Sequence, residues 1–231
     1  MSNIKALIKR SLPATWLRAV QIARNPYPYR SYMDQHQCIF IHIPKAAGTS
    51  VLSAMMGGNE NPDRDHTGYK TYLEANPGKF DRYFKFTFVR DPWDRLISVY
   101  TYLKGGGNGG SDRYFQQLIA DRYPTFAEFV LGYLDKDRIH QHILLRPQFL
   151  FVVDHKDQLM VDYVGRFESI ADDFSKVSQQ LKLGVSLPQV NRSARKDKSA
   201  YLVSQEVIDK IGQLYSRDVA QFGYCAPLLK E

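Results

Sequence analysis

CIFIHIPKAAGTS, at residues 38–50, decides the fold of this chain. Its first six residues are apolar or β-branched, apart from one histidine, and Pro44 ends the run, as is typical of a short buried parallel strand. Gly48, Thr49 and Ser50 then open a segment with helical character over residues 51–56. A strand that turns directly into a helix is characteristic of an α/β protein.

The rest of the chain continues this alternation. Further strands are predicted at 83–89, 149–153 and 162–167. Helices are predicted over 92–104, 125–134, 169–181 and 204–222. Five glycines at 105–110 predict a flexible loop, which could shape a cleft. The pattern predicts a P-loop-like three-layer α/β fold, with a central, mostly parallel sheet flanked by helices.

The length and composition favour one enzyme-sized domain. The 231 residues are 44% hydrophobic and 24% charged, which excludes a wholly disordered chain. The two cysteines exclude a disulfide framework and a four-cysteine zinc site. Residues 37–226 are predicted to form the domain, and residues 1–36 a basic helical extension with a connector.

The N-terminal segment is basic and lacks the apolar core of a signal peptide. No apolar run reaches the roughly 18 residues that a spanning helix requires. Residues 1–24 could pack on the domain, the favoured alternative, or lie on an anionic membrane surface. We therefore expect a cytoplasmic protein, with peripheral membrane contact left open.

A net charge of +7, from 31 basic and 24 acidic residues, favours an anionic partner. Solubility alone explains that charge equally well. The basic residues are spread out and no nucleic-acid-binding motif is present, so no nucleic-acid partner is predicted.

The turn after the first strand has the features of an anion site. Backbone N–H groups, the hydroxyls of Thr49 and Ser50 and the ammonium of Lys45 would converge at a helix N-terminus. A Walker A loop places its lysine directly after the last glycine, whereas Lys45 precedes Gly48 by three residues. A ligand bound without metal therefore fits better than a metal–nucleoside triphosphate, and no metal is expected.

A second motif, RDPWDRLISVY at residues 90–100, follows the next strand. Arg90 lies at the carboxyl edge of the sheet, where open α/β sheets bind ligands. Arg95 and Ser98 are three residues apart and are expected to share a helix face, with Tyr102 one turn further. Arg90 and Ser98 could hold one phosphate from two sides.

Together, residues 41–50 and 88–100 resemble the carbohydrate-type sulfotransferases. Shorter similarities follow, so the resemblance covers roughly residues 38–224; they lie at 145–148, 164–168, 187–193 and 215–224. The resemblance implies a transferase that moves a sulfonate group from 3′-phosphoadenosine 5′-phosphosulfate (PAPS) to a carbohydrate hydroxyl, on a polysaccharide or a glycolipid.

The resemblance also implies roles for single residues. Lys45 would contact the sulfonate, residues 47–50 the 5′-phosphate, and Arg90 with Ser98 the 3′-phosphate. A basic loop around residues 191–195 would close over the nucleotide. The residues expected to bind PAPS are Lys45, Ala47, Gly48, Thr49, Ser50, Arg90, Ser98, Asn191 and Ser193. Relatives often carry Thr where this chain has Ala46, a change that leaves backbone binding intact.

The transfer requires a base, and a neutral histidine suits it. His66 is the first candidate, because it lies between the two motifs, where heparan-type relatives carry a catalytic histidine. His142 is the second candidate, and Asp65 or Glu74 could orient His66. Two other classes of function stay open: a P-loop-type kinase and a non-catalytic nucleotide-binding protein.

Overall fold

The computed structural model of this protein describes residues 27–58, 65–187 and 200–229. The predictions made for residues 1–24 and for Asn191 and Ser193 lie outside these residues. Among the residues described, no helix is both long enough and apolar enough to cross a membrane.

The predicted central, parallel sheet forms the centre of the molecule, with three strands among the described residues rather than the four predicted. The strands are β1 (Cys38–Ile41), β2 (Phe84–Val89) and β3 (Tyr163–Arg166), in the order β1-β2-β3, and both pairs are parallel. Ile41 pairs with Thr87, and Val89 pairs with Arg166. The carboxyl ends of all three strands therefore point to one edge of the sheet.

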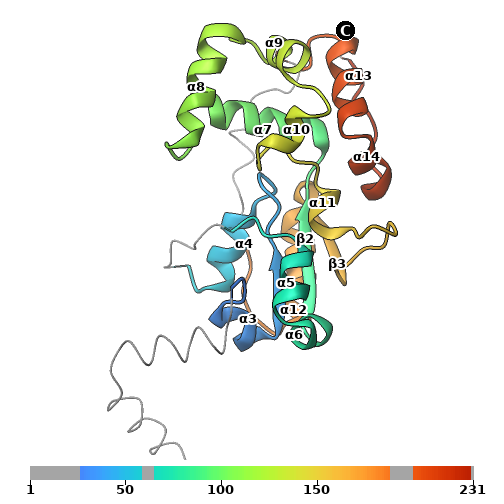
Figure 1. Cartoon of the computed structure of the whole chain (residues 1–231). Helices are drawn as coiled ribbons and strands as arrows, with labels where there is room; N and C mark the ends of the chain where they lie inside the picture. The colour runs from blue at the N-terminus through green and yellow to red at the C-terminus, as the bar shows by residue number, and fades with distance from the viewer. Residues whose placement is uncertain (1–26, 59–64, 188–199, 230–231) are drawn as a thin grey trace, which may run out of the picture.

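Helices cover both faces of the sheet, with α5 in front of the strands and α12 behind them in Figure 1. The helices of the sheet region are α3 (Ser31–His36), α4 (Gly48–Met55), α5 (Tyr69–Ala75), α6 (Pro77–Arg82), α11 (Phe149–Val152) and α12 (Ile170–Gln180), the last preceded by a 3₁₀ turn at Phe167–Ser169. A second, helical region lies beyond the carboxyl edge of the sheet (Figure 1). It contains α7 (Pro92–Lys104), α8 (Ser111–Arg122), α9 (Phe126–Glu128), a π-helix (Phe129–Tyr133), α10 (Arg138–Gln141) and α13 (Gln205–Leu214), and α14 (Ser216–Phe222) follows α13.

Two hydrophobic clusters correspond to these two regions. One surrounds the sheet and includes Phe40, Phe86 and Phe174. The other lies among the helices beyond the sheet and includes Trp93 and Phe129. The polypeptide passes from the first cluster to the second at the end of β2, so the strand tips lie at the junction of two rigid cores.

Several predicted boundaries are wrong. The strand predicted at 149–153 is mostly helix α11, and only Val153 forms a β-bridge, with Leu159. The helix predicted over 204–222 is interrupted at Tyr215 into α13 and α14. The helix predicted over 125–134 begins as α9, with Thr125 as its N-cap, but continues as a π-helix. Helices α5, α6 and α8 were not predicted.

A buried carboxylate explains the error at residues 149–153. Asp218 is fully buried, and its two oxygens accept the backbone N–H groups of Gln148 and Phe149, both at 2.8 Å. These bonds satisfy N–H groups at the start of α11 and favour a helical turn there. Because Asp218 is 70 positions away from Gln148, local sequence patterns do not reveal this cap.

We predict that Asp218→Asn lowers the free energy of unfolding by about 1–3 kcal/mol, because an amide NH₂ would face a buried N–H donor. Urea denaturation measures the change. Asp81→Asn, an exposed acid on α6, is the matched control and should change stability by less than about 0.5 kcal/mol. Equal stability of the two variants would contradict the capping role.

Candidate functional site

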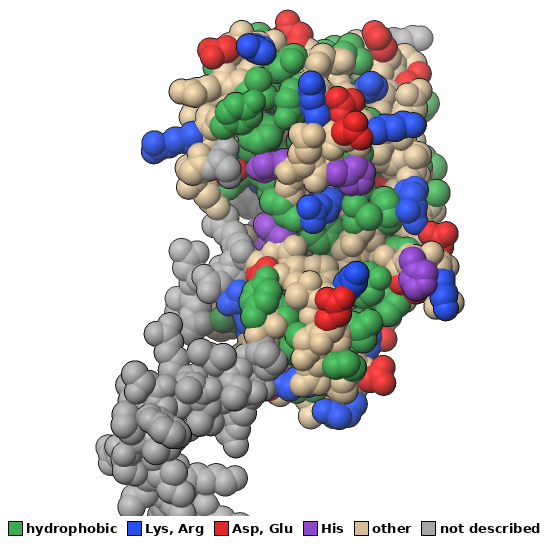
Figure 2. Space-filling view, in the orientation of Figure 1, with side chains coloured by type: hydrophobic (Ala, Val, Ile, Leu, Met, Phe, Trp, Pro, Cys, Tyr) green, Lys and Arg blue, Asp and Glu red, His purple; other side chains and the backbone are tan. Residues whose placement is uncertain are grey.

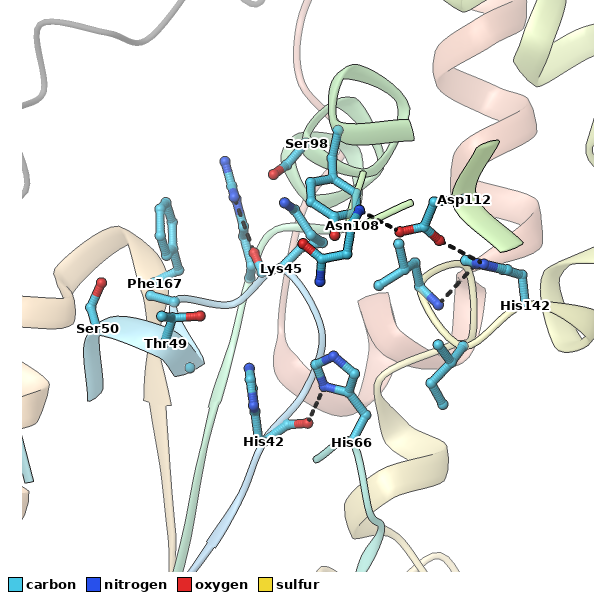
Figure 3. A pocket seen from close by; sticks show the side chains of 16 residues that line it. His42, Lys45, Thr49, Ser50, His66, Ser98, Asn108, Asp112, His142 and Phe167 are labelled. Atoms are coloured by element: carbon cyan, nitrogen blue, oxygen red, sulfur yellow. Dashed lines mark hydrogen bonds and ion pairs between the residues drawn. The ribbon is translucent and has the colours of Figure 1, made fainter. Parts of the chain in front are cut away.

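A pocket of about 430 Å³ opens at the carboxyl ends of the strands, between the sheet region and the helical region. Figure 2 shows histidine side chains gathered midway along one face, and Figure 3 shows the pocket interior. The pocket brings together every predicted site residue that the structure describes, namely Lys45, Ala47, Gly48, Thr49, Ser50, His66, Arg90, Ser98 and His142. It is also lined by residues that the sequence did not single out, among them Asn108, Asp112 and Phe167.

The loop after β1 has an unusual backbone. Lys45 and Ala47 both have a φ of 65°, in the left-handed region that costs non-glycine residues of order 1 kcal/mol or more. Ala47 is the N-cap of α4, whose first turn begins at Gly48. The loop therefore turns sharply enough to present the N-terminus of α4 to the pocket, as an anion site requires.

Gly48 is required by the packing of a neighbouring ring. A Cβ atom at this position would lie 1.8 Å from Cδ2 of His42. His42 is a buried residue just after β1, and its imidazole stacks on Phe40 with ring centroids 5.7 Å apart. The loop can approach the strand this closely only because residue 48 has no side chain.

Arg90, just after β2, is held in place by several contacts. Its Nε donates to Oδ2 of Asp94 at 3.0 Å, and its guanidinium lies 4.0 Å from the centroid of Phe167. The side-chain amide of the fully buried Gln148 binds both backbone groups of Arg90. Its Oε1 accepts the N–H of Arg90 at 2.9 Å, and its Nε2 donates to the carbonyl of Arg90 at 2.8 Å. A planar guanidinium fixed in this way is preorganised to donate hydrogen bonds to the oxygens of an anion such as a phosphate.

A direct hydrogen bond joins the two motifs. Nη1 of Arg90 donates to the backbone carbonyl of Lys45 at 3.1 Å. The ammonium of Lys45 lies over the ring of Tyr102, 4.1 Å from its centroid, which is the geometry of a cation–π contact. Tyr102 and Ser98 lie on successive turns of α7 and both line the pocket. Lys45 and Arg90 thus form one cationic wall.

Arg95, which was expected to share a helix face with Ser98, is not among the residues that line this pocket. Its side chain is buried and donates to the carbonyls of Leu144 and Arg146, both at 3.0 Å. The two residues that neighbour it on α7, Asp94 and Leu96, are also buried. Arg95 therefore holds the 144–146 segment to α7.

His66 is oriented by a backbone carbonyl. Its Nδ1 lies 3.2 Å from the carbonyl oxygen of His42, and the two imidazoles are 4.4 Å apart (Figure 3). A carbonyl only accepts, so Nδ1 carries the proton and a neutral ring has its lone pair on Nε2. The suggested acids are bound elsewhere: Asp65 accepts from Tyr27, and Glu74 lies 3.8 Å from Lys70.

His142 has the opposite arrangement of its ring nitrogens. Its Nδ1 accepts the backbone N–H of Leu144 at 3.3 Å, so a neutral ring is protonated on Nε2. That atom lies 3.6 Å from Oδ1 of Asp112. Burial lowers the pKa of His142, and the neighbouring Asp112 opposes this shift. In the neutral ring, the N–H of Nε2 thus faces Asp112, and the lone pair of Nδ1 accepts the hydrogen bond from Leu144.

Cationic side chains at neighbouring strand tips, with a helix N-terminus beside them, are typical of anion-binding sites in α/β proteins. The sequence model of the sulfotransferase family (Sulfotransfer_2) matches residues 31–225, and the chain belongs to this family. No solved structure matched the chain.

Curated relatives are carbohydrate sulfotransferases of vertebrates. Carbohydrate sulfotransferase 14 of Danio rerio is 25% identical over 230 residues, which cover 84% of this chain and 61% of the relative. Carbohydrate sulfotransferase 11 of the same species is 25% identical, covering 84% and 66%. Carbohydrate sulfotransferase 12 of Xenopus laevis is 24% identical, covering 84% and 59%. The matches therefore span about three fifths to two thirds of these relatives.

We predict that Gly48→Ala lowers the free energy of unfolding by about 1–3 kcal/mol, because its methyl group would overlap the ring of His42. Gly78→Ala is the control, since its added Cβ would meet nothing closer than 3.6 Å.

The double variant Gly48→Ala/His42→Ala removes the overlap. Urea denaturation should therefore show a loss smaller than the sum of the two single losses, by at least about 0.5 kcal/mol. Simple additivity would show that the ring does not determine the residue at position 48.

Proposed function

We propose that this chain transfers a sulfonate group from PAPS to a hydroxyl of a carbohydrate acceptor. The observation that carries the proposal is the meeting of Lys45 and Arg90 in one pocket, through a direct hydrogen bond, in a member of the sulfotransferase family. When bound, PAPS supplies the activated sulfonate.

The pocket residues fit the two phosphate positions of PAPS. The glycine at position 48 lets the loop pack closely against His42, and the α4 N-terminus with Thr49 and Ser50 suits the 5′-phosphate. Arg90 lies at the neighbouring strand tip and Ser98 lies on α7. Together they suit the 3′-phosphate. Phe167 packs on the face of the Arg90 guanidinium, Nε donates to Asp94 and Nη1 to the Lys45 carbonyl, so the phosphate would be bound by the remaining N–H groups of the guanidinium.

Two side chains are proposed to act on the reacting atoms. As the acceptor oxygen bonds to sulfur and the bond from sulfur to the phosphate oxygen breaks, His66 takes the hydroxyl proton on Nε2. Lys45 stabilises the negative charge on the departing phosphate oxygen. The carbonyl of His42 holds His66 in the required tautomer. His142 is the weaker candidate for the base, since its Nδ1 already accepts from Leu144.

The donor is tested with nucleotides that differ by one phosphate. We predict that Arg90→Ala lowers the affinity for adenosine 3′,5′-bisphosphate at least about 10-fold, because charge-assisted hydrogen bonds to the 3′-phosphate are lost. The affinity for adenosine 5′-monophosphate should fall less than about threefold. Isothermal titration calorimetry measures both, with Arg122→Ala, an exposed arginine, as control. Equal losses for both nucleotides would contradict the 3′-phosphate role.

The base is tested with the polysaccharide or glycolipid that gives the fastest transfer from ³⁵S-labelled PAPS. We predict that His66→Ala lowers kcat by about 10²–10⁴ and leaves the affinity for adenosine 3′,5′-bisphosphate nearly unchanged. His155→Ala, at an exposed histidine, should retain full activity. A larger fall in kcat for His142→Ala than for His66→Ala would reverse the assignment.

A further inference from the structure

The pocket has a second wall that the donor does not require. It is lined by Asn108 from the α7–α8 turn, Asp112 from the first turn of α8 and His142 from the C-cap of α10. Lys45, Arg90 and the α4 N-terminus line the other side. Figure 3 shows Asn108 projecting into the space between these two walls, with Asp112 and His142 behind it. An acceptor that reaches His66 and Lys45 through this pocket therefore passes along this wall.

The turn at residues 105–110, between α7 and α8, packs against the side chain of Asp112. Gly106, Gly107, Gly109 and Gly110 all have positive φ, which other residues adopt at a cost. A Cβ at Gly107 would lie 2.3 Å from Oδ2 of Asp112, so the turn closes directly onto that carboxylate. The glycines predicted a flexible loop, but the structure shows a defined turn that places Asn108 in the pocket.

Hydrogen bonds fix the orientation of the carboxylate. Oδ2 of Asp112 accepts the backbone N–H of Asn108 at 3.0 Å, and the N–H of Asp112 donates to the carbonyl of Gly109 at 3.0 Å. Oδ1 faces the protonated Nε2 of His142 at 3.6 Å. The His142 ring packs on Phe115, with centroids 4.6 Å apart. The wall is therefore a fixed set of polar groups with one negative charge.

This charge lies opposite a cationic wall, and the two walls suit different ligands. A carboxylate accepts hydrogen bonds from hydroxyls and repels other anions. A side-chain amide both donates to and accepts from a hydroxyl. We propose that Asn108 and Asp112, the latter oriented by His142, recognise the acceptor, and that they select a neutral sugar unit through its hydroxyls at the point of transfer. This inference rests on the proposed function.

The test uses two glycosides that differ only at C6, methyl β-galactoside and methyl β-galacturonide. Saturation-transfer difference NMR measures both dissociation constants with adenosine 3′,5′-bisphosphate bound. The quantity of interest is the preference for the neutral glycoside, taken as the ratio of the two constants. We expect Asp112→Asn to reduce this preference about fivefold or more, because the charge repulsion is lost. The Asn side chain keeps an oxygen for the N–H of Asn108, which preserves the turn.

Two control variants sharpen the result. Asp121→Asn makes the same charge change at an exposed position of α8, and its preference should equal that of the wild type. Asn108→Ala should lower the affinity for both glycosides by a similar factor, about threefold or more.

An adjoining hollow shares His66 and is lined by Lys70, His140 and Arg146. They are present in every variant, so their attraction for the uronide does not affect the comparison.

An unchanged preference in Asp112→Asn, or a wild-type protein that binds neither glycoside, would overturn the proposed acceptor wall. Unchanged affinities in Asn108→Ala would overturn the part assigned to Asn108. A protein that fails to bind adenosine 3′,5′-bisphosphate would instead contradict the proposed function, so the two failures are distinguishable.

Discussion

The hydrogen bond from Arg90 to the carbonyl of Lys45 joins the tips of β1 and β2. It ties a guanidinium already fixed by Asp94 and Phe167 to a loop residue in a left-handed conformation. Movement of one strand tip would therefore disturb the other. This link gives a physical reason for the two sequence motifs to occur together, because each supports the geometry of the other.

The location of the pocket follows from the division of the hydrophobic core. One cluster surrounds the sheet and the other fills the helical region, and the strand tips lie between them. Polar groups can gather at this junction without interrupting either cluster. The same junction separates the charges: the residues after the strand tips supply cations, and the first turn of α8 supplies Asp112. A charged donor and a hydroxyl-bearing acceptor could thus approach from opposite sides.

The sequence predicted the parts of the fold that depend on local patterns. Buried strand β1 and the Pro92 start of α7 follow from short stretches of chain. That Lys45 and Arg90 belong to one site was implied by the resemblance of both motifs to one family, and the two residues line one pocket. The errors arise where distant residues decide the structure, as at α11, whose cap is supplied by Asp218. Asp112 was missed for the same reason, because only folding brings its carboxylate to the pocket.

The most direct test of the central claim is a crystal structure of the protein with adenosine 3′,5′-bisphosphate. The account predicts one nucleotide across the two strand tips, with its 5′-phosphate at the N-terminus of α4 and its 3′-phosphate on Arg90 and Ser98. A nucleotide bound in another cavity, or one whose 3′-phosphate contacts neither of these side chains, would contradict it.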